Sequence, residues 1–100
     1  MTNYFHLDVE LKLRDEDKAV VTPAYFLGSI EESLQGFFGE IGGQTDLQVI
    51  KFDKNQKRAI LRVHEEFVTR TRSAITLIGH FQDIPCHFII RNTSKEQLDF

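Results

Sequence analysis

The sequence contains a single cysteine, no tryptophan, and no apolar run of the length that a membrane helix needs. One cysteine excludes a disulfide within the chain and is typical of a reducing compartment. A transmembrane helix needs roughly 18 or more consecutive apolar residues, so we expect no membrane partner. The opening stretch MTNYFHLDVE lacks the basic and apolar regions of a secretory signal peptide. We therefore expect an intracellular protein whose core relies on its nine phenylalanines.

Combinations of residues that would carry chemistry are missing as well. The four histidines, at positions 6, 64, 80 and 87, form no pair with metal-ligand spacing, and HEE at 64–66 is not the zinc motif H-E-x-x-H. Cys86 alternates with apolar residues, which favours a small buried side chain over a nucleophile. The glycines at 39–43 follow an expected helix instead of opening one, so they do not indicate a phosphate loop. We predict no enzyme activity for the chain by itself, no metal, no cofactor and no small-molecule substrate.

The residues that are present are typical of one globular domain. One hundred residues with 41% hydrophobic and 27% charged side chains fit a single domain over residues 1–100. The net charge of −3 conceals an asymmetry. Residues 1–50 carry three basic and nine acidic side chains, whereas residues 51–100 carry nine basic and six acidic ones. The second half can therefore present a positive zone to an anionic partner although the whole chain is acidic.

The hydrophobic pattern changes period along the chain and predicts successive elements. Residues 5–13 alternate apolar and polar side chains, the period of a half-buried strand. From Pro23 the period becomes helical, with Thr22 as the capping residue and the glycines at 39, 42 and 43 as the end. The later elements are strands at 45–52 and 58–64 joined by DKNQK, a helix at 65–78 closed by Gly79, a strand at 83–91, and a short terminal helix from Ser94.

This order of elements, β-α-β-β-α-β, predicts an α+β fold. We expect a ferredoxin-like (split β-α-β) sandwich, in which two helices cover one face of a four-stranded antiparallel sheet. The expected strand order is fourth, first, third, second. On the other face, acidic residues of the central strand are flanked by basic ones, which favours cross-strand ion pairs. The third strand, RAILRV, lacks the aromatic pattern of an RNA-recognition motif, so base stacking on the strands is disfavoured while phosphate contacts remain open.

The first helix has two contrasting faces. One arc is apolar and is expected to be buried: Phe26, Leu27, Ile30, Leu34, Phe37 and Phe38. The opposite face carries Tyr25, Gly28, Glu32 and Gly36, which we predict to form a protein interface. Each interior glycine costs about 0.8–1.0 kcal/mol relative to alanine, but on an outer face it lets another surface approach closely. Neutral drift in a tolerant helix is an alternative with equal support.

Positive charge is densest on the predicted hairpin, at Lys51, Lys54, Lys57 and Arg58. A solvated face with scattered counter-charges is the alternative to a binding role. Two further arginines interrupt the second helix. Arg70 lies at the border of the buried arc, and we predict that its stem packs there while its head pairs with Glu66. Arg72 points away from that arc, has no acidic residue three or four positions off, and is a candidate for contact with a partner.

Six short stretches, taken together and in order, point to a known family. They are HLDVEL (6–11), VTP (21–23), FFGEIGG (37–43), AILRV (59–63), SAITLIG (73–79) and CHFII (86–90). In these the chain resembles the protein subunits of ribonuclease P and ribonuclease MRP, in the group that joins the fourteen-kilodalton subunit with its Pop-five relative. The fourteen-kilodalton branch looks nearer, because FGEIG and TLIG occur in one sequence. Where relatives often carry tryptophan just before SAITLIG, this chain has Arg72.

The resemblance implies a scaffold and not a catalyst. Such subunits work in a ribonucleoprotein that removes the 5′ leader of precursor tRNA, where the RNA and its metal ions do the chemistry. The implied partners are ribonuclease P RNA, the Pop-five-type subunit and the thirty-kilodalton subunit. The implied location is the nucleus, and the nucleolus in particular, of a eukaryotic cell. The resemblance directs five cations toward RNA, namely Lys51, Lys54, Lys57, Arg58 and Arg72, and it leaves Arg72 open to a protein contact as well.

A different class of function stays open at this point. The same fold serves free-standing regulatory or small-ligand-binding modules, which are commonly homodimeric. A stable homodimer whose melting temperature shifts with a metabolite would favour that alternative.

Overall fold

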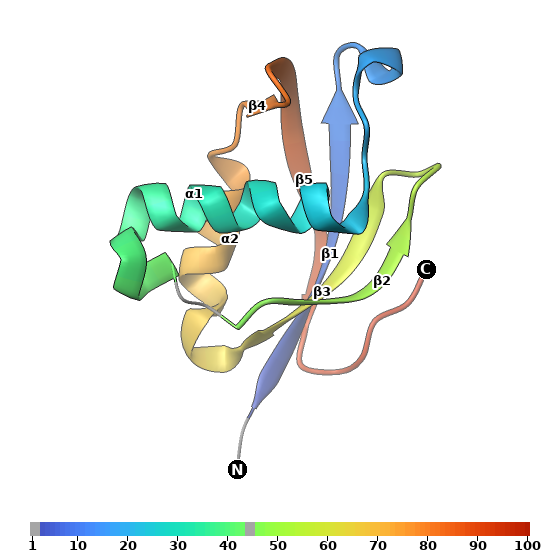
Figure 1. The fold of residues 1–100 in the computed structure, drawn as a ribbon. Coiled ribbons are helices and arrows are strands. Elements are labelled where there is room, and N and C mark those ends of the chain that lie inside the picture. Colours follow the sequence, from blue (N-terminus) through green and yellow to red (C-terminus); the bar gives the residue numbers. More distant parts are fainter. Residues whose placement is uncertain (1–2, 44–45) are drawn as a thin grey trace.

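The computed structural model describes residues 3–39 and 46–100 in full and residues 40–43 as backbone (Figure 1). Its elements are β1 (Tyr4–Leu13), α1 (Pro23–Gly43), β2 (Gln48–Asp53), β3 (Arg58–His64), α2 (Val68–Thr76), β4 (His80–Phe81) and β5 (Ile84–Ser94), with 3₁₀ turns η1 (Glu16–Lys18) and η2 (Glu65–Phe67). None of the described helices is long and apolar enough to cross a membrane. The α+β class predicted from the sequence is confirmed.

The described strands form one antiparallel sheet in the order β2-β3-β1-β5-β4. The order predicted for the four long strands is confirmed, but the predicted number of strands is wrong because β4 adds a fifth at the edge. β4 has two residues, too few to show alternation in a sequence. It pairs with the start of β5 through a two-residue turn in which Gln82 and Asp83 have φ of 52° and 65°, the left-handed backbone that tight hairpins require.

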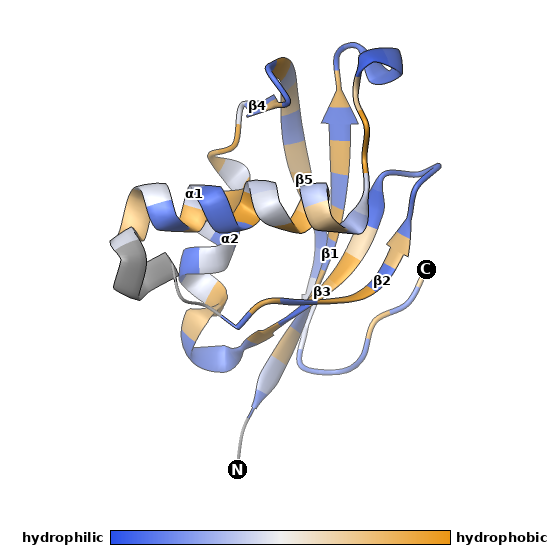
Figure 2. Cartoon of the chain, viewed as in Figure 1, coloured by the Kyte–Doolittle hydropathy of each residue, from blue (hydrophilic) through white to orange (hydrophobic). Residues whose placement is uncertain are grey.

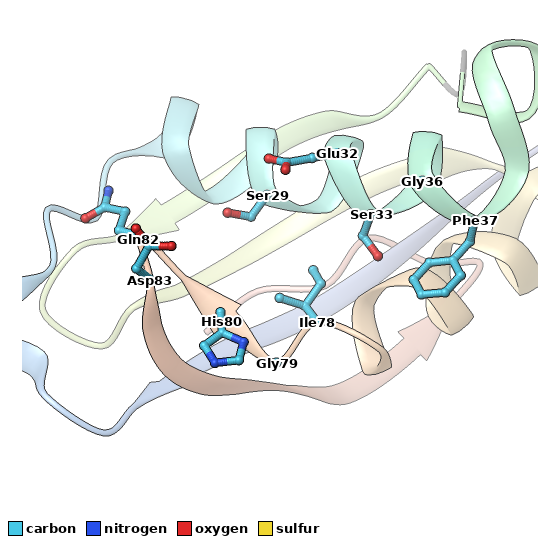
Figure 3. A pocket seen from close by; sticks show the side chains of 10 residues that line it. All are labelled: Ser29, Glu32, Ser33, Gly36, Phe37, Ile78, Gly79, His80, Gln82 and Asp83. Carbon is cyan, nitrogen blue, oxygen red and sulfur yellow. The ribbon is translucent and has the colours of Figure 1, made fainter.

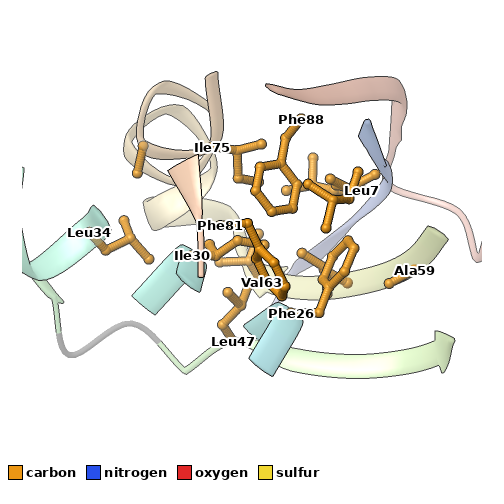
Figure 4. Close-up of a cluster of buried hydrophobic side chains, with 14 of the residues drawn as sticks. Leu7, Phe26, Ile30, Leu34, Leu47, Ala59, Val63, Ile75, Phe81 and Phe88 are labelled. Carbon is orange, nitrogen blue, oxygen red and sulfur yellow. The ribbon is translucent and has the colours of Figure 1, made fainter. Parts of the chain in front are cut away.

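Both helices lie on the same face of the sheet, and the core fills the space between the layers (Figures 1 and 4). Figure 2 shows the alternation of apolar and polar residues along β1 and β5 that produces this single apolar face. The largest fully buried contributions come from Leu7 and Leu11 of β1, Phe26, Ile30 and Leu34 of α1, Leu61 and Val63 of β3, Ile75 of α2, and Phe81 of β4. The alternation along the strand predicted at 83–91 expects Ile84, Cys86, Phe88 and Ile90 to point inward. Phe88 belongs to the cluster, the half-buried Cys86 and Ile90 pack against it, and Ile84 is buried.

The ends of α1 follow the sequence signals. The Thr22 hydroxyl accepts a hydrogen bond from the backbone N–H of Tyr25 at 3.1 Å, which satisfies a donor that the first helical turn leaves unpaired. Pro23 opens the helix, where its missing N–H costs nothing. Gly39 has φ 77° and interrupts the helical backbone, a conformation that glycine adopts without steric cost. Helical backbone resumes beyond it as far as Gly43.

Two of the six residues predicted to be buried on α1 are exposed. Phe26, Ile30 and Leu34 are fully buried and Leu27 packs against the core, but Phe37 and Phe38 are 58% and 41% exposed. The reason is that α1 runs past the sheet (Figure 1), so the end of its apolar stripe has no strand to face. The hydrophobic period of a helix indicates which way each side chain points. It does not indicate where the sheet beneath the helix ends.

The second helix and the terminal segment also differ from the prediction. The predicted helix 65–78 begins as the 3₁₀ turn η2 and continues as α2 only to Thr76, so Gly79 does not close it. Gly79 instead accepts a hydrogen bond from the N–H of Cys86 at 2.9 Å, because the chain there already approaches β5. The terminal helix predicted from Ser94 does not form. β5 extends to Ser94, whose hydroxyl accepts from the N–H of Glu96 in a local turn.

We predict that Phe26→Ala and Phe37→Ala, two identical changes on one helix, have very different effects. The Phe26 ring packs edge-on against Phe52 and Phe88, with centroids at 5.8 and 5.3 Å, so its removal should cost about 3–5 kcal/mol. Removing the exposed Phe37 ring should change stability by less than about 0.5 kcal/mol. Urea unfolding of both variants measures this difference, and equal losses would contradict the described position of α1.

Candidate nucleic-acid and protein interfaces

The β2–β3 hairpin has the turn that the sequence predicts. The Asp53 carboxylate accepts from the backbone N–H of Gln56 at 3.0 Å, and Lys57 closes the turn with φ 52°. The Lys57 carbonyl accepts from the N–H of Leu11 at 2.8 Å, and its ammonium lies 3.9 Å from the carboxylate of Glu16. Lys54 is exposed at the tip and has no ion-pair partner among the described residues. Of the turn cations, Lys54 is therefore the one whose full charge faces solvent.

The side chain of Arg58 forms an ion pair within the sheet. Its guanidinium donates two hydrogen bonds to the carboxylate of Asp8, at 2.8 and 2.5 Å, and these hold the pKa of Arg58 above its ordinary value. Asp8 is only 5% exposed, so its charge needs a fixed partner. Asp8 thus forms a cross-strand ion pair, as predicted for the acids of the central strand, but with Arg58, which the sequence analysis had directed toward RNA. A binding role for Arg58 would have to compete with this bidentate pair.

A second ion-pair group lies beside the first on the face of the sheet away from the helices, which we call the open face. The carboxylate of Glu10 accepts from Arg91 at 2.7 Å and lies 2.8 Å from the ammonium of Lys12. The bond from Lys12, followed by that from Arg91, lowers the pKa of Glu10. The acids of the central strand therefore neutralise cations from β1 itself and from both neighbouring strands.

The same face near the start of β1 is polar and closely packed. Arg62 donates to the side-chain oxygen of Gln48, and its guanidinium lies 4.8 Å from the centre of the Tyr4 ring. His6 pairs with Arg62 across the strands, and its Nδ1 is buried without a hydrogen-bond partner among the described residues. Burial, and after it the charge of Arg62, lowers the pKa of His6. The imidazole is accordingly neutral near pH 7.

Lys51 contacts the segment after β5, a contact that the sequence analysis did not predict. Its ammonium donates to the carboxylate of Asp99 and, at 2.5 Å, to the carbonyl of Phe100. The Phe100 ring lies under both Lys51 and Arg58, at 4.6 and 4.5 Å from its centroid. Residues 95–100 have no hydrophobic period. The partners are also 48 and 49 residues apart in the chain, so no local sequence pattern predicts this contact.

A groove runs along α1 on the layer of the helices. One wall is α1, with Ser29, Glu32, Ser33, Gly36 and Phe37, and the other is the stretch from Ile78 to Asp83 (Figure 3). The hollow continues toward the start of α1, where Tyr25, Gly28 and Phe81 line it. We call these lining residues together the α1 groove. The four α1 residues predicted as a protein interface, Tyr25, Gly28, Glu32 and Gly36, lie along it, whereas Arg72, the fifth candidate for a protein contact, does not.

The walls of the α1 groove are held by hydrogen bonds. The side-chain amide of Gln82 exchanges two hydrogen bonds with the backbone of Val20, at 2.9 and 2.8 Å, as a neighbouring strand would. The hydroxyl of Ser33 donates to the Ala74 carbonyl at 2.7 Å and ties α1 to α2. A Cβ added at Gly28 or Gly36 would meet no atom within 4 Å. The groove is therefore preformed, and its glycines open toward solvent.

Arg72 is not brought together with the hairpin cations. It lines a separate hollow with Thr69, Ser73, Thr76 and Ile90, between α2 and β5, whereas the hairpin lies at the β2 side of the sheet (Figure 1). The structure thus divides the predicted RNA-binding set. Arg70 lies over the rings of Phe67 and Phe38, at 4.9 and 5.6 Å. Its packing at the core edge agrees with the prediction, and its pairing with Glu66 stays a prediction.

The described part of the chain shows neither a metal site nor an activated thiol. No three histidine, cysteine or acidic side chains among residues 3–39 and 46–100 lie close enough to hold a metal ion. Burial raises the pKa of the Cys86 thiol, which disfavours the nucleophilic thiolate.

Comparison with known proteins identifies relatives of the chain. The family model described as the Rpp14/Pop5 family matches residues 4–95. The chain belongs to the Rpp14/Pop5 family. A curated mouse (Mus musculus) relative, ribonuclease P protein subunit p14, is 25% identical over 93 residues, which are 93% of this chain and 75% of the mouse protein. A chain in the cryo-EM structure of yeast ribonuclease MRP matches with a TM-score of 0.83 at 15% identity, covering 100% of this chain and 81% of that chain; that likeness shows the fold.

Membership of the Rpp14/Pop5 family confirms the family inferred from the six sequence stretches. Those stretches lie mainly in the packed layers: HLDVEL in β1, AILRV in β3 and CHFII in β5. Two of the other stretches also reach the α1 groove, since Phe37 of FFGEIGG and Ile78 and Gly79 of SAITLIG line it.

Proposed function

We propose that this Rpp14/Pop5 family member is a non-catalytic protein subunit of ribonuclease P, and of ribonuclease MRP as well. The observation that carries the proposal is the family match over residues 4–95, together with the likeness to the mouse p14 subunit. In this function the RNA of the particle removes the 5′ leader of precursor tRNA, and the protein positions that RNA and its sister subunits. The core of the fold is a ferredoxin-like sandwich to which β4 is added.

The proposal assigns different surfaces to different partners. The α1 groove with Tyr25, Gly28, Glu32 and Gly36 faces a sister protein, either the Pop-five-type or the thirty-kilodalton subunit. The hairpin faces ribonuclease P RNA, with Lys54 as its free cation, while Lys51, Lys57 and Arg58 are already bound within the chain. Arg72 is a further contact on the other side of the molecule. The particle works in the nucleus, and we place it in the nucleolus. The free-standing regulatory module is not favoured, because the family match spans nearly the whole chain.

Affinity purification of the tagged chain from its own cells tests the function. We expect ribonuclease P RNA and the two sister subunits to co-purify, together with cleavage of precursor tRNA by the recovered particle. Recovery of the protein as a homodimer without that RNA would contradict the proposed function.

We predict that Lys54→Ala weakens RNA retention more than Lys18→Ala does. Both side chains are exposed and both changes remove one positive charge, but Lys54 lies at the proposed RNA surface and Lys18 lies in η1. Loss of one phosphate contact should reduce the slope of log affinity against log salt by about 0.7–0.9. RNA recovery from the particle at increasing salt provides the measurement. Equal effects of the two variants would remove the hairpin from the RNA interface.

We predict that Gly28→Gln blocks assembly with a sister protein while leaving the fold intact. The space beyond Gly28 is open, and replacing an interior helical glycine should stabilise the free chain by about 0.5–1 kcal/mol. The longer side chain would nevertheless fill the α1 groove. Gly28→Ala, which adds only Cβ, serves as the matched control. Melting curves and co-purification separate the two effects, and normal assembly of Gly28→Gln would exclude this part of the groove.

A further inference from the structure

The chain beyond β5 lies on the open face and contacts the hairpin cations. After Ser94 it turns back and ends beside β2 (Figure 1). Lys51 bonds to the Asp99 carboxylate and the Phe100 carbonyl, while the Phe100 ring packs under Lys51 and Arg58. Asp99 and Phe100 thus place a carboxylate and an aromatic ring against two cations of the open face.

Beside this contact the open face carries a buried apolar residue, Ile60. Ile60 lies between Ala59 and Leu61, which face the helices, so its own side chain points to the open face. It is nevertheless fully buried. Its strand partner on β2 is Lys51, the residue that Asp99 and Phe100 contact. Asp99 and Phe100 therefore contact the strand neighbour of a buried apolar residue on the open face.

We propose that Asp99 and Phe100 occupy, within the chain itself, a subsite for one nucleotide of single-stranded RNA. The Asp99 carboxylate lies where a phosphate would meet Lys51, and the Phe100 ring lies where a base would stack on the guanidinium plane of Arg58. The segment must leave before RNA can bind there, so it lowers the affinity of the hairpin for RNA. This inference rests on the proposed function, because it takes the hairpin to be the RNA side of the protein.

The ion pair between Lys51 and Asp99 is weak enough for RNA to displace Asp99. The hydrogen bond from Lys51, and after it that from the Phe100 N–H, lowers the pKa of Asp99, so the carboxylate is charged at neutral pH. The side chains of Lys51 and Asp99 are 42% and 79% exposed, and exposed ion pairs are weak. An RNA strand that also reaches Lys54 can therefore compete with it through several phosphates. Arg58 can keep its pair with Asp8, since stacking uses the face of the guanidinium and not its N–H groups.

The test compares Asp99→Asn with Glu96→Gln in the full chain. Each change removes one negative charge from the same segment, but only Asp99 is bonded to Lys51. The probe is a fluorescein-labelled oligouridylate of about 10 nucleotides, within the range of single-strand binding sites. We expect Asp99→Asn to bind it roughly three- to fivefold more tightly than the unchanged chain, the upper range for an exposed ion pair. Its salt slope should steepen by about 0.7, as one added phosphate contact requires, whereas that of Glu96→Gln should stay the same.

Two further variants assign the effect to the proposed subsite. In a Lys51→Ala background the gain from Asp99→Asn should disappear, because the freed phosphate contact no longer exists. Phe100→Ala should raise affinity by uncovering the guanidinium of Arg58. Melting curves of every variant show that the folded chain is being compared.

Unchanged or weaker binding by Asp99→Asn would overturn the inference, as would a gain that persists without Lys51. Absence of measurable oligouridylate binding by every variant would overturn it too. The proposed function is judged separately, by whether ribonuclease P RNA co-purifies with the chain, so either can fail while the other stands.

Discussion

The burial of β1 between two antiparallel neighbours is the constraint on which the rest of the structure depends. β3 pairs along one side and β5 along the other, and the apolar side chains of β1 supply the floor on which both helices pack. Because side chains alternate along a strand, the same placement forces Asp8 and Glu10 onto the open face at the centre of the sheet. A carboxylate as buried as Asp8 is stable there only with a cation held against it.

Much of the charge pattern on the open face follows from that requirement. Arg58 forms an ion pair with Asp8, and Arg91 and Lys12 form ion pairs with Glu10. Lys51 is bound by Asp99 of the terminal segment. A count of basic residues in the second half of the sequence therefore overstates the charge that a partner meets. Free positive charge remains toward the periphery, as at Lys54 on the hairpin tip. The α1 groove lies on the helix layer, so a protein and an RNA could bind without competing for the same surface.

The accuracy of the sequence analysis depended on the range of the interactions involved. The strand period of β1, the cap at Thr22 and the hairpin turn at Asp53 are local, and each was predicted correctly. The exposure of Phe37 was not predicted, because the end of the sheet beneath α1 is set by other strands. β4 was missed because two residues carry no period. The four residues expected as a protein interface do share a groove, since helical spacing alone places them on one face, but its second wall, from Ile78 to Asp83, had no signal in the sequence.

The sequence by itself determined the family, the order of the long strands and the apolar faces that form the core. These depend on spacing between near neighbours and on a series of short stretches that occur in a fixed order. Only the tertiary structure decided which cations remain free. Arg58 and Asp8 are 50 residues apart, and Lys51 and Asp99 are 48 apart, so no local pattern couples them. A long charged side chain pairs with whichever group the fold brings within reach, and that choice is made when strands and the terminal segment come together.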